Sequence, residues 1–176
     1  MSLSVAAVPP VRGLVCNLRT GEAMSFLLNP TELREQVQVN YSRLQVPGLS
    51  HEILQFSSTG NVTLPVELYL DKYFARAVSA EDDPDILAFK RFLQALTVPA
   101  GGASDVTSGG PPRALLVWPG LVSLTCVVTN LEFRYEQFGA RGEVLVYRAQ
   151  VTFEEIRDVR VTSEEMRVQG SLRGGM

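Results

Sequence analysis

Residues 61–71, NVTLPVELYLD, decide the fold that we predict for this chain of 176 residues. Apolar side chains occupy every second position: Val62, Leu64, Val66, Leu68 and Leu70. Alternation with period two is typical of a β-strand that buries one face. Pro65 interrupts the polar face and has no backbone N–H to donate to a neighbouring strand. We therefore expect this strand to lie at a sheet edge, or to carry a bulge, at that point.

The segments before this strand also read as β-structure. Residues 13–18 and 22–28 are apolar runs separated by a short turn, which predicts a hairpin with Gly21 at positive φ. Residues 31–47 predict a strand or an extended arm, with a short helix over 31–36 as the alternative, and Pro47-Gly48 forms a turn. Residues 53–57 are the expected partner strand of 61–71, joined to it through Thr59-Gly60-Asn61.

The second half of the chain contains three more strand patterns, over residues 114–118, 121–137 and 143–155. Within 121–137 the apolar positions are even up to Val128 and odd from Leu131. This change of parity near Thr129-Asn130 indicates a bulge or burial on both faces. Gly139 and Gly142 predict the hairpin turn that leads into 143–155.

Residues 84–96 form the one predicted helix. Asp83 is the expected N-cap, Pro84 suits the first helical position, and a stripe of apolar residues recurs at helical spacing. The Gly/Pro/Ser-rich residues 99–112 predict a loop. We therefore divide the chain into an N-terminal arm (1–12), a β domain (13–156) and a C-terminal arm (157–176).

The sum of these elements predicts a mainly β, α+β fold. Alternating strands need a second layer to cover the apolar face, and the single helix is too small to cover a whole sheet. A small β-barrel or sandwich with one helix packed on its side meets that need.

Composition excludes several classes of function. The net charge of −3 argues against a general nucleic-acid binder, which needs a basic face. No apolar run approaches the roughly 18 residues of a membrane-spanning helix, so we expect no membrane insertion. Residues 1–10 lack a signal-peptide pattern, so we expect assembly in the cytoplasm, with the final particle cytoplasmic, membrane-docked or released. Cys16 and Cys126 read as buried free thiols, with a disulfide as the alternative.

The sequence shows no pattern typical of a catalytic, cofactor or metal site. His51 is the only histidine, and with two distant cysteines it cannot complete a closed zinc site. The chain has no phosphate-binding glycine loop ending in lysine, and no serine lies in a nucleophile-elbow pattern. We therefore predict no catalytic residues, no cofactor and no metal. A hydrolase that uses His51 stays open as a third alternative.

Several short motifs occur in a specific order along the chain. They are residues 26–33 (FLLNPTEL), 39–41 (VNY), 46–48 (VPG), 54–56 (LQF), 63–71 (TLPVELYLD), 111–118 (PPRALLVW), 131–138 (LEFRYEQF) and 142–153 (GEVLVYRAQVTF). Together they resemble the N-terminal domain of contractile injection system tube and baseplate proteins, which occur in antifeeding-prophage-like and other phage-tail-like particles. The chain departs from that pattern at Leu28, where relatives often have Phe, and after Trp118, where their Gly is displaced.

The resemblance implies an assembly protein with a tail-tube-like β-barrel whose strands join across subunits. It implies a homohexameric adaptor or tube-initiator ring between the trimeric spike hub and the inner tube or a second adaptor, in contact with other baseplate components. Many relatives carry a C-terminal peptidoglycan-binding LysM module, which we expect this chain to lack. The alternatives are a peptidoglycan- or surface-binding module without its LysM domain, and the main inner tube subunit. The expected inter-subunit contact residues are Asn40, Tyr41, Pro47, Gly48, Phe56, Pro65 and Trp118.

Overall fold

The structure is a computed structural model that describes residues 11–79, 82–99 and 110–157. The strands are β1 (Leu14–Asn17), β2 (Ala23–Ser25), β3 (Val39–Leu44), β4 (Ile53–Thr59), β5 (Thr63–Asp71), β6 (Ala114–Trp118), β7 (Val122–Phe138) and β8 (Val144–Glu155); the helices are α1 (Lys72–Val78) and α2 (Leu87–Ala95). The predicted mainly β fold is confirmed. Most of the predicted arms at 1–12 and 157–176, and most of the 99–112 loop, lie outside the described residues.

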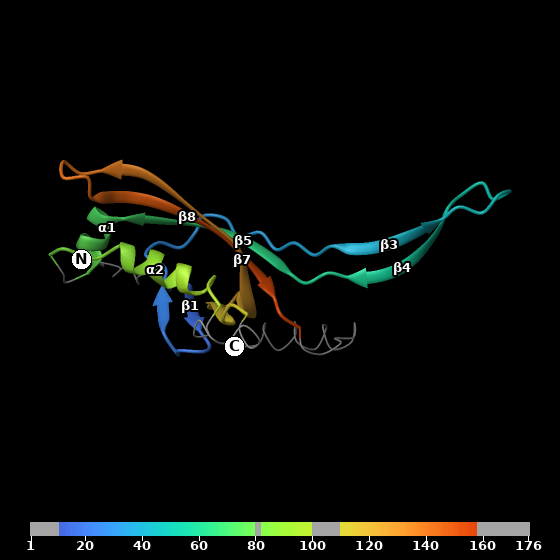
Figure 1. The fold of residues 1–176 in the computed structure, drawn as a ribbon, viewed down its shortest axis with the longest axis horizontal. Helices are drawn as coiled ribbons and strands as arrows, with labels where there is room; N and C mark the ends of the chain where they lie inside the picture. The colour runs from blue at the N-terminus through green and yellow to red at the C-terminus, as the bar shows by residue number, and fades with distance from the viewer. Residues whose placement is uncertain (1–10, 80–81, 100–109, 158–176) are drawn as a thin grey trace, which may run out of the picture.

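The body is an antiparallel sheet with the strand order β2-β1-β6-β7-β8-β5, and β3 and β4 form a separate two-stranded ribbon (Figure 1). A closed barrel requires the two terminal strands to pair with one another. In the part of the chain that the structure describes, β2 and β5 do not pair, so the sheet stays open and no closed barrel forms. The open form leaves two different strands at the sheet ends.

Strand β5 has the predicted alternation, and its apolar set is buried at 5% exposure or less. It is the terminal strand of the sheet, which confirms the edge position predicted from Pro65. Its partner is β8, in a ladder that runs from Thr63↔Glu154 to Asp71↔Val146. Strand β8 buries Tyr147, Ala149, Val151 and Phe153 on the same side, so the two strands share one apolar face.

The predicted pairing of residues 53–57 with 61–71 is wrong. Strand β4 pairs with β3 instead, from Val39↔Thr59 to Leu44↔Ile53. Residues 59–61 do not reverse the chain, because Gly60 pairs backward with Gln38 and the next residues run straight into β5. Strand β8 adds its buried apolar residues to the same face of the sheet as β5, whereas every residue of β4 is exposed.

The first hairpin is confirmed: β1 pairs with β2 through a turn in which Gly21 has φ of 75°. The predicted second strand, 22–28, is shorter than expected. It ends at Ser25, and Phe26 then turns into the core at 1% exposure. Residues 31–36 contain no helix, so the extended interpretation of this segment holds.

The predicted bulge in residues 121–137 is confirmed. The register of β7 against β8 shifts between Val128 and Asn130, which leaves Thr129 unpaired with a β8 residue. Even-numbered side chains of β7 are buried before this point, and odd-numbered ones pack against the core after it. The extra residue therefore keeps one side of the long strand apolar along both halves.

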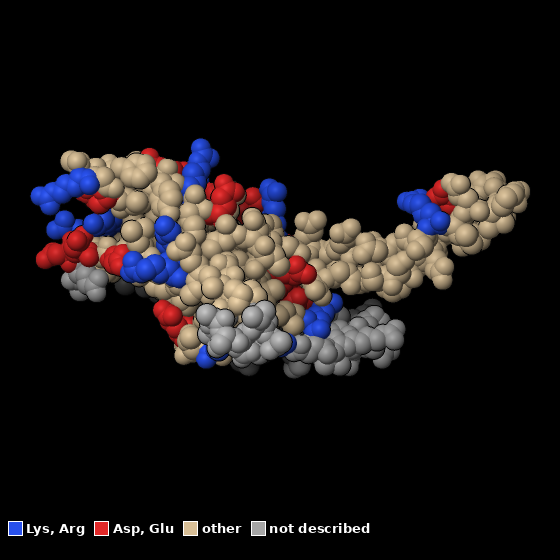
Figure 2. Space-filling view, in the orientation of Figure 1, with Lys and Arg blue, Asp and Glu red and all other residues tan. Residues whose placement is uncertain are grey.

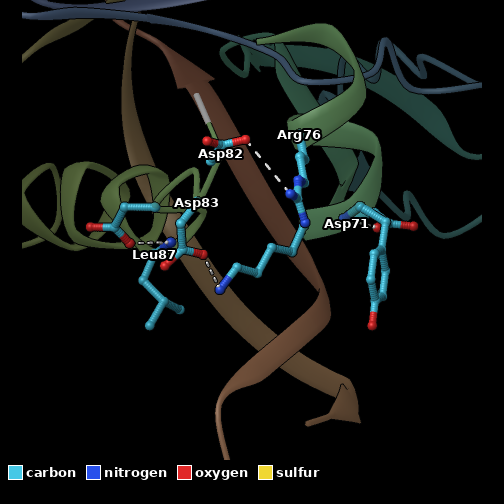
Figure 3. A network of polar contacts seen from close by, with 8 residues as sticks. Asp71, Arg76, Asp82, Asp83 and Leu87 are labelled. Atoms are coloured by element: carbon cyan, nitrogen blue, oxygen red, sulfur yellow. Dashed lines mark hydrogen bonds and ion pairs between the residues drawn. The ribbon is translucent and has the colours of Figure 1, made fainter. Parts of the chain in front are cut away.

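Helix α2 lies within the predicted range 84–96 and buries Phe89, Phe92 and Leu93 against the sheet. The expected Asp83 cap is wrong, because the Asp85 carboxylate accepts the Leu87 N–H at 3.0 Å. Asp83 forms an ion pair with Lys72 of α1 instead, at 2.6 Å (Figure 3). The Asp83 carboxylate gains a charge-assisted interaction with the Lys72 ammonium group, and Asp85 takes its place at the start of α2.

Helix α1 was not predicted from sequence. The Asp71 carboxylate caps it by accepting the N–H groups of Tyr73 and Phe74 at 2.8 and 3.2 Å. Its buried residue is Ala75, so the helix lacks the apolar stripe that makes α2 recognisable. The pair of Arg76 with Asp82, at 3.6 Å, ties α1 to the segment before α2 (Figure 3).

The cysteines are both free, as predicted. Cys126 is fully buried, and burial raises the pKa of its thiol to about 12. Cys16 lies on β1, separated from β7 by β6, and its row of the ladder contains Leu115 and Thr125. Cys126 lies in the adjacent row, with Asn17 and Ala114, so the two thiols point to opposite faces of the sheet. No disulfide can join them in this fold.

Candidate assembly surfaces

Residues 39–59, here called the arm, project from the body as β3, β4 and the loop between them (Figure 1). Every residue of the arm is exposed. The arm nevertheless carries many large apolar side chains: Val39, Tyr41, Leu44, Val46, Leu49, Ile53, Leu54 and Phe56. Large exposed apolar side chains concentrated in one segment mark an interaction site.

The register of the ribbon divides the arm into two faces. Tyr41 pairs with Phe56, their ring centroids 6.0 Å apart and edge to face, and Arg43 pairs with Leu54 on the same side. We call this side, together with Val39, the apolar face of the arm. It alternates with a polar face, because neighbouring residues of a strand point to opposite sides.

The polar face of the arm carries hydroxyl and amide side chains that bind one another, and it ends in the exposed apolar pair Leu44 and Ile53. Asn40 donates its amide N–H to the Ser58 hydroxyl at 3.2 Å, and the Ser42 and Ser57 hydroxyls lie 2.8 Å apart. A register shift between Asn40 and Tyr41 adds the extra residue that brings Ser57 to this side. These groups satisfy part of their hydrogen bonding within the ribbon.

The arm is fixed to the body by backbone hydrogen bonds at its root. Gln36 and Thr63 exchange two of them, at 2.9 and 2.8 Å, and the Gly60 N–H donates to the Gln38 carbonyl at 2.7 Å. A Cβ on Gly60 would lie 3.2 Å from that carbonyl oxygen, so the close approach favours glycine. The root sets the direction in which the arm leaves β5.

Charges are sparse on the arm. On the visible side they gather near its tip, whereas the body carries mixed charges over much of its surface (Figure 2). Arg43 and Glu52 form an ion pair at 3.1 Å, and Gln45 donates to the same carboxylate at 2.8 Å. These two hydrogen bonds, that of Gln45 first, lower the pKa of Glu52. The arm is therefore a nearly neutral surface.

The free edge of β5 is a second candidate contact. Thr63 gives both its backbone groups to Gln36, so they point away from β8. Backbone groups alternate in direction along an antiparallel strand, so those of Pro65, Glu67 and Tyr69 also point away from β8. Pro65 offers a carbonyl alone, whereas Glu67 and Tyr69 each offer an N–H and a C=O. Beyond Thr63, and within the described residues, β5 pairs with β8 alone.

A groove of about 680 Å³ lies beside this edge. Its walls come from residues 28–32 with Arg34 on one side, and from β5 and β8 on the other. Pro65, Glu67 and Tyr69 line it together with Arg148 and Gln150. The groove gives the edge a mixed polar and apolar surround, which suits an extended segment of another chain.

Arg148 organises the polar face of the sheet. Its guanidinium binds Glu67 of β5 and Glu136 of β7, each at 2.7 Å, and lies 5.4 Å from the centroid of the Tyr69 ring. Strand β5, which is remote in sequence from the β7–β8 hairpin, is thereby joined to both strands on the side opposite the core. Sequence reasoning missed this network, because it depends on the pairing of β5 with β8.

The Glu67–Arg148 pair predicts a pH-dependent stability. Hydrogen bonds from Arg148 and then Gln150 lower the pKa of Glu67. A carboxyl with a lowered pKa stabilises the fold above its ordinary pKa of about 4.3, and the effect is lost as the pH falls through the folded value. Glu67→Gln should therefore reduce the free energy of unfolding by about 0.5 kcal/mol at neutral pH, the usual size for a half-exposed pair. Urea unfolding at neutral and at acidic pH measures the difference.

The loss should disappear in acid, where wild-type Glu67 is itself neutral. Glu132→Gln is the matched control, because Glu132 lines the same polar face. If Glu67→Gln lowers the free energy of unfolding equally at both pH values, the charge of Glu67 does not contribute to stability.

The predicted contact residues fall on the arm, on the edge of β5 and at the end of β6. Asn40, Tyr41 and Phe56 lie together on the arm, Pro47 and Gly48 form its tip with Gly48 at φ of 92°, and Pro65 lies on the edge of β5. Trp118 ends β6 and is only partly exposed, its ring 6.1 Å from that of buried Phe26. The structure therefore places Trp118 in packing within the subunit, and its role between subunits stays a prediction.

The arm loop also contains His51, whose side chain is exposed. Among the described residues, no group of three or more His, Cys, Asp and Glu side chains is placed to hold a metal ion. No helix in these same ranges is long and apolar enough to cross a membrane.

Comparison with known proteins identifies the family to which the chain belongs. A family model described as "Contractile injection system tube protein" matches residues 16–163. No curated protein matches the chain. A solved structure described as "Cryo-EM structure of the anti-feeding prophage (AFP) baseplate, 6-fold symmetrised" aligns at 13% identity and a TM-score of 0.37, over 86% of this chain and 95% of that chain. Because the family model covers most of its length, the chain belongs to the contractile injection system tube protein family.

Proposed function

We propose that this chain forms a homohexameric adaptor ring between the trimeric spike hub and the inner tube of a contractile injection system. The observation that carries the proposal is the arm, a segment in which every residue is exposed although many are large and apolar. An isolated two-stranded hairpin is marginally stable in water. Such a segment gains its stability from a neighbouring subunit.

A closed ring of identical subunits needs two different, complementary surfaces on each subunit. The open sheet supplies two unlike ends, the long edge strand β5 and the three-residue strand β2. The backbone groups of Glu67 and Tyr69 would extend the sheet by accepting a strand from the next subunit. In this proposal the arm and the β5 edge are the principal contacts within the assembly.

Copy number tests this proposal directly. The chain is co-expressed with cognate hub and tube proteins, and particles are purified and analysed by native mass spectrometry and electron microscopy. We expect six copies per particle, placed between hub and tube, and no tube growth from hubs when the chain is omitted. Normal tubes in its absence would overturn the proposal.

A second candidate is the main inner tube subunit, which the family description favours. In that case the copy number would rise in proportion to tube length, and the purified chain would polymerise without a hub. The same preparations distinguish the two candidates, because an adaptor stays at six copies in particles of every length.

A further inference from the structure

Helix α1 is held to the body by little apolar contact. Of its seven residues, all of them described, Ala75 alone is buried, and Tyr73 and Val78 are exposed. An isolated helix needs about 12–15 residues to be stable in water, so seven residues do not keep this shape unaided. Tyr73, Phe74 and Val78 are also of types that favour strands. The helix therefore depends on polar contacts with its surroundings.

Two ion pairs join α1 to the segment before α2. Lys72 binds Asp83 at 2.6 Å, and Arg76 binds Asp82 at 3.6 Å. Both carboxylates point toward α1 in Figure 3. The Lys72 side chain is 27% exposed, whereas that of Arg76 is 62% exposed, so water and salt screen the Lys72 pair less. Lys72 is therefore the main anchor of α1.

Acidic side chains from two parts of the chain act on Lys72. A hydrogen bond to Asp83 raises the pKa of Lys72, and the charges of Asp83, Glu143 and Asp85 act in the same direction. Asp83 and Asp85 lie just before α2, and Glu143 lies just before β8. The attraction that holds α1 in place is thus mainly electrostatic.

The end of β5 and the start of α1 share one residue, Asp71. It is the N-cap of α1 and also the last residue of β5 that pairs with β8. Strand β8 begins at Val144, and within the described residues neither Val144 nor Leu145 pairs with β5. Continued in the same antiparallel register, the ladder would pair Lys72 with Leu145. Tyr73 would then lie opposite Val144.

We propose that α1 is a latch that ion pairs hold closed, and that its release lets residues 72–73 lengthen β5 along β8. Salt weakens pairs between exposed charges, whereas it does not weaken the burial of apolar residues. The sheet buries a large apolar set and α1 buries one residue, so the latch opens before the body does. This device belongs to the single subunit and does not depend on the ring proposed above.

Hydrogen exchange of the purified chain measures the opening of the latch. Exchange over residues 72–79, where the Ser79 N–H donates to the Ala75 carbonyl at 2.8 Å, is followed by mass spectrometry. Raising NaCl from about 0.01 M to about 1 M shortens the Debye length from roughly 30 Å to roughly 3 Å. We expect exchange in α1 to accelerate about fivefold, the upper end for an exposed ion pair, and exchange in β8 by less than about twofold. Exchange in α1 that is independent of salt overturns the latch.

Two matched variants test Lys72 as the anchor. Lys72→Gln removes the charge and keeps a good helix former. At low salt it should accelerate exchange in α1 about fivefold, and added salt should then change that rate by less than about twofold. Arg91→Gln is the control, because it breaks the Arg91–Asp85 pair, which does not include α1. Equal acceleration of α1 by the two variants overturns Lys72 as the anchor.

Paired cysteines test the lengthening of β5. In a Cys16→Ser background, Tyr73→Cys is combined with Val144→Cys, and disulfide formation with oxidised glutathione is followed on non-reducing gels. The control combines Tyr73→Cys with Leu145→Cys, which is one residue out of register and on the opposite face of the strand. We expect the first pair to form at least about fivefold faster at high salt than at low salt, and the control pair to lag behind it. Equal rates for the two pairs at high salt overturn the lengthening of β5.

Discussion

Replacing residues 39–59 by the dipeptide Asn-Gly is expected to abolish assembly and to leave the body folded. Gln38 and Gly60 already pair at the root, so a two-residue turn joins them with the geometry of a tight hairpin. Each removed residue is exposed, so the free energy of unfolding of the body should change by less than about 1 kcal/mol. Incorporation into particles should fall below detection, as measured by mass spectrometry of purified particles.

Circular dichroism and thermal unfolding of the purified variant provide the control for folding. A variant that is folded and still enters particles at the wild-type copy number would show that the arm is dispensable. The proposed function would then lose the observation that supports it.

The second large effect is a loss of stability, expected from a substitution in the hydrophobic core. Phe153 is fully buried where β8 meets β5, and Phe153→Ala removes a ring from a closely packed site. Such changes cost about 3–5 kcal/mol, from lost burial and from the cavity that remains. For a chain of this size the Tm should fall by roughly 10 °C, measured by scanning calorimetry.

The matched control is the same substitution on the arm. Phe56 is 58% exposed, so Phe56→Ala should change the stability of the isolated chain by less than about 0.5 kcal/mol. It should instead weaken assembly, because its ring lies on the apolar face beside Tyr41. Equal destabilisation by both variants would mean that the arm packs on its own body in solution.

Sequence reasoning succeeded where the signal is local. The alternation of Leu64, Val66 and Leu68 and the parity change near Thr129 each reflect the direction of side chains along a single strand. Strand partners are not encoded locally, so β8 was missed as the partner of β5, and the Glu67–Arg148–Glu136 network with it. The short helix α1 was missed because its stability comes from the Asp71 cap and two ion pairs more than from an apolar stripe.

The arm shows a different limit of local patterns. Val39 and Tyr41 alternate with polar residues as in a half-buried strand, yet every residue of β3 and β4 is exposed in the single chain. The pattern specifies a buried face, and the isolated subunit supplies nothing to bury it. The apolar residues of the arm are thus consistent with an assembled state, in which a neighbour completes the layer that the pattern requires.

The bulge at Thr129 has a consequence for how this family can vary in length. Removing Thr129 would place Val128 and Asn130 next to one another, opposite Phe153 and Thr152, in a regular ladder. The side chains of both halves of β7 would keep their present directions relative to the core. A one-residue deletion at this position therefore keeps the strands in register, whereas the same deletion within a regularly paired stretch of β7 turns the side chains that follow to the opposite face. Natural insertions and deletions within β7 should accumulate here.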